Sequence, residues 1–190
     1  MRRRRGLVMG AQNGSNERAL GQRGARRAAE FTMRSGAACV RHVQETSGLM
    51  HTKLLSAGVL GIDAFPVEVE VDVTNAMPKT VLLGLPDAAV KESLDRVRTA
   101  MVNSGYHFRV HRLTINLAPA DLRKEGPAFD LPIALGALIA TEQIQSDKLG
   151  QYAVAGELSL DGRVRPVRGA LPIAMLCKQM GVKGLILPRA

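Results

Sequence analysis

The residues with the clearest chemical potential lie in one short segment, residues 123–132, which reads RKEGPAFDLP. Gly126 and Pro127 predict a tight turn, and the apolar residues from Ala128 onward predict a helix that tolerates Pro132 in its first turn. Such a strand-to-helix turn directs backbone N–H groups outward, where they can bind an anion or serve a catalytic nucleophile. Because Ala128 has no hydroxyl, the segment predicts a prepared turn that lacks its reactive side chain.

Nucleotide and metal sites have no comparable signal in the sequence. The P-loop pattern G-x-x-x-x-G-K-[ST] is absent, since the nearest segment, residues 84–92, lacks the second glycine and the hydroxyl that would bind magnesium. His107 and His111 are four residues apart but have no cysteine or acidic partner at ligand spacing. We therefore expect this chain itself to bind no cofactor, no nucleotide and no metal.

Basic residues near the turn and in the later half of the chain are candidates for contact with an anion. Arg163 and Arg165 share one face of an expected strand, and Arg168 follows it, so the three could meet phosphates of DNA. They also fit a solvated edge strand that is protected by its charge. We favour this second interpretation because no aromatic residues accompany the arginines. The candidate contacts with an anion or DNA are Arg123, Lys124, Gly126, Arg163, Arg165 and Arg168.

The net charge of +9 comes mostly from the first 49 residues. This segment contains ten Arg and three Glu, whereas residues 50–190 contain 16 basic and 14 acidic residues. Its Gly, Ser, Asn and Gln content predicts a disordered extension, and it lacks the apolar core of a secretory signal. Three interpretations stay open: a basic arm that binds nucleic acid, an organelle transit segment, or upstream sequence read from a start codon placed too early.

Residues 50–190 have the composition of one folded domain. Hydrophobic residues make up 46% of the chain, its mean hydropathy is +0.01, and no apolar run approaches the roughly 18 residues of a membrane helix. The two cysteines, Cys39 and Cys177, are too few for a disulfide framework and indicate a reducing compartment. We expect a cytoplasmic protein without a membrane contact and with a buried free thiol at Cys177.

Three segments show a clear period. Residues 67–73 alternate valine with Glu or Asp, which predicts a strand with one buried face and one acidic face that would repel a phosphate backbone. Residues 86–104 predict a helix with one apolar face, with Pro86 in its first position and ion pairs Asp87–Lys91 and Glu92–Arg96 on the other face. Residues 128–141 predict a central helix, because nearly all of its faces are apolar.

The remaining elements complete a mixed α/β fold, an α+β arrangement in which helices pack on a mixed sheet. Asp161 and Gly162 predict a two-residue hairpin turn. Gly136 predicts a close approach of the central helix to its neighbours. Further strands are expected at 54–62, 80–83, 112–118, 152–160, 163–167 and 184–187, and a further helix at 169–180.

Four long motifs follow one another in order: GIDAFPVEVEVDV at 61–73, GLPDAAVKES at 84–93, INLAPADLRKEGPAFDLPIAL at 115–135 and GELSLDGRVRPVRGALPIA at 156–174. Together they resemble the N-terminal domain of the YifB/ComM family of magnesium-chelatase-like (ChlI-like) AAA+ ATPases. The resemblance implies a fold similar to the Lon protease domain and to a domain of a ribosomal protein. It also implies that Ala128 and Leu171 stand where Lon-type proteases carry their catalytic Ser and Lys, so no catalytic dyad is expected.

The resemblance further implies a non-catalytic domain of a protein linked to DNA processing, namely branch migration in natural transformation. The family's ATPase module, with ATP and Mg²⁺ as cofactors and a hexameric ring as its assembly, has no counterpart in residues 50–190, so we expect this chain to be an N-terminal fragment. A Lon-like peptidase is disfavoured because the dyad is missing, and magnesium chelation because no site for it is visible. A standalone DNA-binding protein acting through residues 1–49 remains the other alternative.

Overall fold

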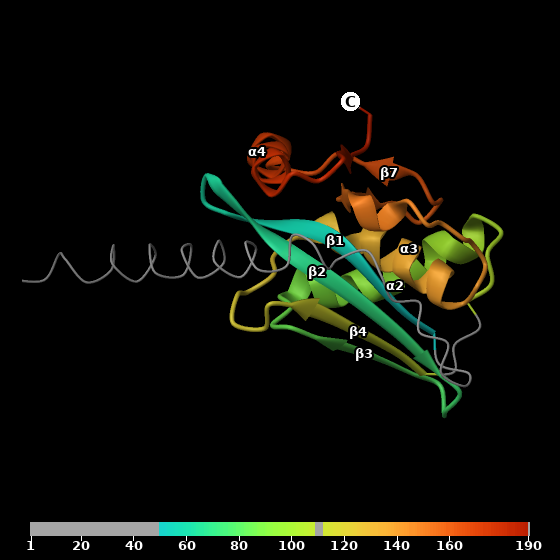
Figure 1. Ribbon diagram of the computed structural model, residues 1–190. Helices are drawn as coiled ribbons and strands as arrows, with labels where there is room; N and C mark the ends of the chain where they lie inside the picture. Colours follow the sequence, from blue (N-terminus) through green and yellow to red (C-terminus); the bar gives the residue numbers. More distant parts are fainter. Residues whose placement is uncertain (1–49, 109–111, 190) are drawn as a thin grey trace, which may run out of the picture.

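The computed structural model describes residues 50–108 and 112–189 (Figure 1). The expectations for residues 1–49, including Cys39, and for His111 fall outside these ranges. The described residues fold into a six-stranded mixed sheet with three α-helices, which confirms the mixed α/β class. Within the same residues, no helix is long and apolar enough to cross a membrane.

The six strands lie in the order β3-β4-β2-β1-β5-β8. The long hairpin of β1 and β2 forms the centre; β2 pairs antiparallel with β4, while β3 runs parallel to β4, and β5 and β8 extend the sheet in parallel beyond β1. A separate two-stranded sheet joins β6 and β7. The strands are β1 (Met50–Leu60), β2 (Asp63–Thr74), β3 (Lys79–Leu83), β4 (Arg112–Ala118), β5 (Tyr152–Val154), β6 (Glu157–Leu158), β7 (Val164–Arg165) and β8 (Gly184–Ile186).

Helices cover both faces of the sheet. α2 (Ala88–Asn103) and α3 (Asp130–Ala140) pack over the valines of β2 and form the larger core, while α4 (Ala170–Met180) packs over β1, β5 and β8 and forms a second one. Alternation along β1 separates the two cores, since Leu54 reaches α3 whereas Ala57 packs with Ile173 and Cys177. Burial raises the pKa of the Cys177 thiol, which confirms the expected buried free cysteine.

The predicted alternation along β2 is confirmed. Its core-facing valines at 67, 69 and 71 are fully buried, and the acidic side chains between them are half-buried on the opposite face. Lys53 of β1 crosses this face and pairs with Glu68 at 2.7 Å and Glu70 at 2.6 Å, and these carboxylates raise the pKa of the lysine. The acidic face is therefore partly neutralised within the sheet, which the sequence pattern did not indicate.

The central helix lies close to the sheet at Gly136, as expected. A Cβ added at this position would lie 2.6 Å from Cγ2 of Val71. The helix itself begins later than predicted: residues 127–129 form a 3₁₀ turn, η1 (Pro127–Phe129), and α3 starts at Asp130.

One expected strand, residues 152–160, is wrong in its extent. The structure divides it into β5 and β6, which belong to different sheets. The chain leaves the main sheet at Gly156 because its N–H donates to the carbonyl of Ala128 at 2.9 Å and its carbonyl accepts the N–H of Leu131 at 3.0 Å. The hairpin loop also exceeds two residues, since the N–H of Ser159 bonds to the carbonyl of Arg163.

The two ion pairs expected on α2 are not formed. Asp87 is the N-cap of the helix and accepts the N–H of Val90 at 2.7 Å, so Pro86 precedes the helix instead of beginning it. Arg96 turns away from Glu92 and binds the buried carboxylate of Asp130 at 2.9 Å. Asp87 therefore caps the helix, and Arg96 binds an acidic residue of α3, which the spacing along α2 alone does not reveal.

Gly84, which ends β3, offers a test of the packing between β3 and β4. A Cβ added there would lie 2.1 Å from the carbonyl oxygen of Leu117, and the backbone has φ +96°. We expect Gly84→Ala to lower the free energy of unfolding by about 3 kcal/mol, because backbone must move to admit the methyl group. Chemical denaturation measures the change.

Gly105→Ala is the matched control for this prediction. Gly105 has φ +84° and no atom within 4 Å of the added Cβ, so its substitution carries only the conformational cost of about 1 kcal/mol. Equal losses in the two variants would show that the close approach at Gly84 contributes nothing.

Candidate functional site

The Gly-Pro turn lies between β4 and α3 and is held against the N-terminus of α2. The N–H of Lys124 donates to the carbonyl of Leu85 at 3.2 Å, and the N–H of Asp87 donates to the carbonyl of Lys124 at 3.0 Å. The N–H of Gly126 then reaches the Asp87 carboxylate at 3.3 Å. A single carboxylate therefore caps a helix and fixes the glycine of the turn, whose φ of +80° favours this residue type.

Backbone N–H groups of the turn are largely used inside the protein. Besides the N–H of Gly126, that of Asp130 bonds to the carbonyl of Pro127, and that of Leu131 bonds to the carbonyl of Gly156 at 3.0 Å. We expected these groups to face outward toward an anion. The N–H of Gly126 is therefore not available to bind an external anion, because it already donates to the Asp87 carboxylate.

The two positions that the resemblance assigns to a catalytic dyad lie on different elements. Ala128 is half-buried in η1, and its carbonyl is bound by the N–H of Gly156. Leu171 lies in the first turn of α4 with 72% of its surface exposed. Neither side chain can attack a carbonyl or take up a proton.

Lys124 is the amine nearest to the turn in sequence, and it is buried. The whole residue is 0% exposed, and its Nζ donates to the carbonyl oxygens of Pro119 and Leu122. Burial lowers the pKa of Lys124 to about 8, against the opposing charge of Asp121. The expected contact of Lys124 with DNA or an external anion is therefore wrong, since the ammonium faces backbone carbonyls inside the protein.

Asp130, the first residue of α3, joins three elements at the same turn. Its buried carboxylate binds Arg96 of α2 in a bidentate pair, Nε to Oδ2 at 2.9 Å and Nη2 to Oδ1 at 3.2 Å, and accepts the N–H of Leu158 from β6 at 3.1 Å. Burial raises the pKa of the Asp130 carboxyl, while the ion pair and the Leu158 N–H act in the opposite direction.

The sequence interpretation did not identify the roles of Asp130 and Asp87. A lone Asp in an otherwise apolar helix start was the available signal for the first, and an Asp directly before a helical period was the signal for the second. Their distant partners, Arg96 and Gly126, carry no local sequence signal.

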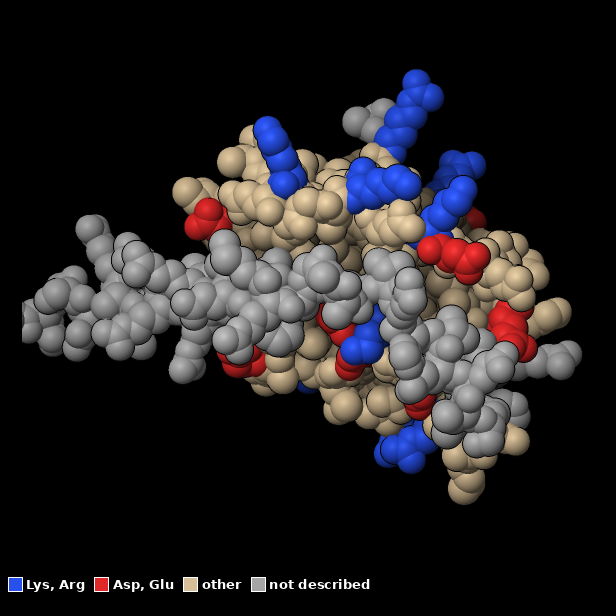
Figure 2. All heavy atoms as spheres, in the orientation of Figure 1, with Lys and Arg blue, Asp and Glu red and all other residues tan. Residues whose placement is uncertain are grey.

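The remaining candidate contact residues are exposed to solvent. Arg123 pairs with Glu125 at 3.4 Å, Arg163 with Asp161 at 3.4 Å, and Arg165 with Glu157 at 3.6 Å, all at the surface. Only Arg165 lies on a strand, because β7 is limited to Val164–Arg165 and Arg168 precedes α4. Figure 2 shows Lys and Arg side chains gathered along the edge of the molecule formed by β7, α4 and the C-terminal segment.

Metal binding has no support in the part of the chain that the structure describes. Within residues 50–108 and 112–189, no three His, Cys, Asp or Glu side chains approach closely enough to hold an ion. His107 is exposed, and its backbone, not its ring, bonds to Gln143.

Fold and turn together define a class of protein: a mixed α/β domain with a Gly-Pro turn, followed by an alanine, ahead of a buried helix. The family model described as subunit ChlI of Mg-chelatase matches residues 69–190, and the chain belongs to this family.

Curated relatives support the same assignment. The chain is 44% identical over 138 residues to the uncharacterized protein YifB of Escherichia coli, which covers 73% of this chain and 26% of YifB. It is 43% identical over 134 residues to the competence protein ComM of Haemophilus influenzae, covering 70% of this chain and 26% of ComM. The resemblance to the YifB/ComM family is thereby confirmed, and the chain spans about a quarter of the length of these relatives.

A more distant similarity extends to proteases. Lon protease 2 of Bacillus subtilis is 32% identical over 98 residues, which cover 52% of this chain and 17% of the protease.

Proposed function

We propose that residues 50–189 form a non-catalytic, Lon-protease-like domain of a ComM-like AAA+ protein that takes part in DNA processing. The observation that carries the proposal is the state of the Gly-Pro turn. Ala128 has no hydroxyl, the N–H groups of Gly126, Asp130 and Leu131 bind within the protein, and the neighbouring Lys124 is buried against carbonyls. A domain with this turn retains the framework of a hydrolase and none of the groups that perform hydrolysis.

One feature of residues 84–92 supports the proposal that this domain binds no ATP. The strand-loop-helix at 84–92 places a carboxylate, Asp87, at the N-terminus of α2, where a phosphate would need positive groups. ATP and Mg²⁺ therefore belong, in this proposal, to the ATPase module that family members carry elsewhere. The same module would assemble the hexameric ring.

Two observations support a role of this protein in DNA processing. The relative ComM is named a competence protein, and residues 162–189 of this chain contain six basic residues and no acidic residue. We place the protein in the cytoplasm, where DNA is available and where Cys177 stays a free thiol.

DNA binding by the full chain tests the proposed function. The ten arginines of residues 1–49 would bind DNA by themselves, so the measurement uses a full-length variant in which all ten are replaced by glutamine. We expect this variant to bind a fluorescent 30-base-pair duplex at low salt and to lose affinity steeply as salt rises.

The unsubstituted chain is the control and is expected to bind more tightly by the contribution of the first 49 residues. Absence of any binding by the neutralised variant at low salt would contradict the DNA-processing role of residues 50–189. It would favour the alternative in which residues 1–49 alone bind nucleic acid.

A further inference from the structure

The near-neutral charge of residues 50–190 conceals a strong separation of charge. Residues 50–161 contain ten basic and 14 acidic residues, whereas residues 162–189 contain six basic residues and no acidic one. The six are Arg163, Arg165, Arg168, Lys178, Lys183 and Arg189. We call the surface that carries them the C-terminal basic face.

We infer that the C-terminal basic face binds the phosphate backbone of duplex DNA without reading its sequence. This inference rests on the proposed function and adds the surface and the kind of contact. All six side chains are exposed, so each can reach a ligand without a change in the fold.

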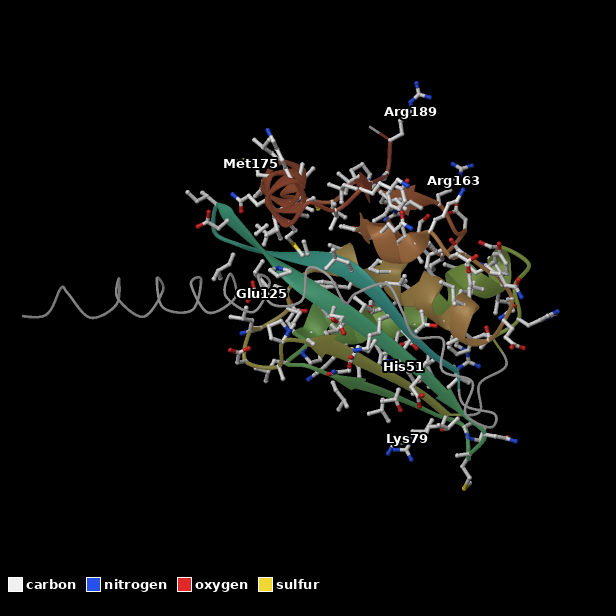
Figure 3. The ribbon with its side chains drawn as sticks, viewed as in Figure 1. His51, Lys79, Glu125, Arg163, Met175 and Arg189 are labelled. Atoms are coloured by element: carbon white, nitrogen blue, oxygen red, sulfur yellow. The ribbon has the colours of Figure 1, made fainter. Side chains whose placement is uncertain are left out.

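Several Lys and Arg side chains lie along one edge of the molecule. β7, α4 and β8 are consecutive in the chain, and Lys and Arg side chains cluster over them in Figure 2. Figure 3 labels Arg163 and Arg189, which both extend outward from this edge, while Lys79 lies at the opposite edge of the view. In extended chain, Cα atoms two residues apart, such as those of Arg163 and Arg165, lie about 6.6 Å apart. One DNA strand carries a phosphate about every 3.4 Å along the axis, so this spacing is about that of every second phosphate.

The acidic neighbours of the face do not block it. Arg163 meets Asp161 at 3.4 Å and Arg165 meets Glu157 at 3.6 Å, with the arginine side chains 87% and 61% exposed. Solvent-exposed pairs of this kind contribute little, so a bidentate phosphate can replace them. Asp161 also accepts hydrogen bonds from Ser159 and from the N–H of Arg163, both at Oδ1, whereas the ion pair uses Oδ2.

The chemistry of the face favours backbone contacts over base contacts. Residues 162–189 contain no Phe, Tyr or Trp, and binding to single strands relies on stacking of bases on aromatic rings. No α-helix of the face presents a row of polar side chains to a groove, since α4 exposes Leu171 and Met175 instead. Guanidinium groups, in contrast, match phosphate oxygens in number and direction.

The test compares two triple variants in the full chain whose ten early arginines are glutamine. The first is Arg163→Gln/Arg165→Gln/Arg168→Gln, and the matched control is Lys79→Gln/Lys91→Gln/Lys148→Gln, which removes the same charge from exposed positions elsewhere. Fluorescence anisotropy follows binding of two duplexes of unrelated sequence between about 25 and 200 mM salt. Thermal unfolding verifies that both variants remain folded.

We expect the slope of log Kobs against log [salt] to fall by about 2 to 3 in the arginine variant, with at least a tenfold loss of affinity at the lowest salt. The lysine variant keeps the slope of its parent to within about 1, and the two duplexes bind equally well. Equal losses in both triple variants would overturn the inference, because they would show an effect of net charge alone, while the proposed function would stand.

Anionic vesicles provide the second arm, because Leu171 and Met175 give α4 an apolar surface near the basic residues. We expect no arginine-dependent binding to vesicles of phosphatidylserine and phosphatidylcholine. Arginine-dependent vesicle binding without DNA binding would overturn the inference and assign the face to a lipid surface. DNA binding that discriminates between the two duplexes would also contradict it.

Discussion

Asp130→Ala is expected to lower the free energy of unfolding by about 3 to 5 kcal/mol, the largest effect of any single substitution considered for this domain. The carboxylate is fully buried and binds the guanidinium of Arg96 and the N–H of Leu158. Its removal leaves a partly buried positive charge without a carboxylate partner and takes the acceptor from a buried backbone N–H. Urea denaturation of the purified chain at neutral pH measures the loss.

Two further variants serve as controls for the loss of stability in Asp130→Ala. Asp130→Asn keeps an oxygen for the Leu158 N–H and loses only the ion pair, so it should lose less stability than the alanine variant. Asp147→Ala removes an exposed carboxylate and should change stability by less than about 0.5 kcal/mol. A loss in Asp130→Ala no larger than in Asp147→Ala would show that the network at the turn does not hold α2, α3 and β6 together.

The second large effect concerns pH and Lys124. Burial lowers the pKa of this amine to about 8, whereas the unfolded chain holds its proton up to the ordinary value of 10.5. Between these two values the unfolded state binds one more proton than the folded state, so the free energy of unfolding rises with pH. Relative to Lys124→Met, the wild type should gain about 3 kcal/mol between pH 8 and 10.5, since one unit is worth about 1.4 kcal/mol.

Lys148→Met is the control for the pH experiment because Lys148 is exposed. The difference between that variant and the wild type should stay constant over the same pH range. A constant difference between wild type and Lys124→Met would mean that the Lys124 amine keeps an ordinary pKa, and it would contradict its burial against Pro119 and Leu122.

Much of the fold could be predicted because its signals are local. The alternation of β2 and the apolar faces of α2 and α3 each arise from residues within one element, and each is confirmed. The division of residues 152–160 into two strands could not be predicted. It depends on hydrogen bonds between Gly156 and the distant Ala128 and Leu131.

The turn was located correctly from Gly126, Pro127 and Ala128, but its environment was not. Whether Lys124 faces solvent or carbonyls depends on how residues 119–122 fold over it. Glu92 lies four residues before Arg96 and was the expected partner. Arg96 instead binds Asp130, which lies 34 residues away in sequence. Sequence spacing identifies possible partners on one helix, whereas tertiary packing decides which partner is used.

The charge of the C-terminal segment is visible in the sequence, and its role stays a prediction. Counting residues 50–190 as one unit gave a nearly neutral body, and three arginines were then assigned to a protected edge strand. The structure limits β7 to two residues, and Figure 3 shows Arg163 and Arg189 extending outward on the same side of the molecule. Residues 162–189, taken separately, contain all six basic residues of the C-terminal basic face and no acidic residue.

Hydrolysis of fluorescent casein tests the central claim, that the Gly-Pro turn is a framework without catalysis. The assay compares the unsubstituted chain with Ala128→Ser/Leu171→Lys, which restores the two reactive residue types at the positions implied by the resemblance to Lon-type proteases. We predict no cleavage by either chain, because the N–H groups of Gly126 and Leu131 are bound inside the protein and Leu171 is 72% exposed to solvent. Cleavage by the unsubstituted chain would contradict the account outright, and cleavage by the double variant would show that the turn still presents the geometry of an active site.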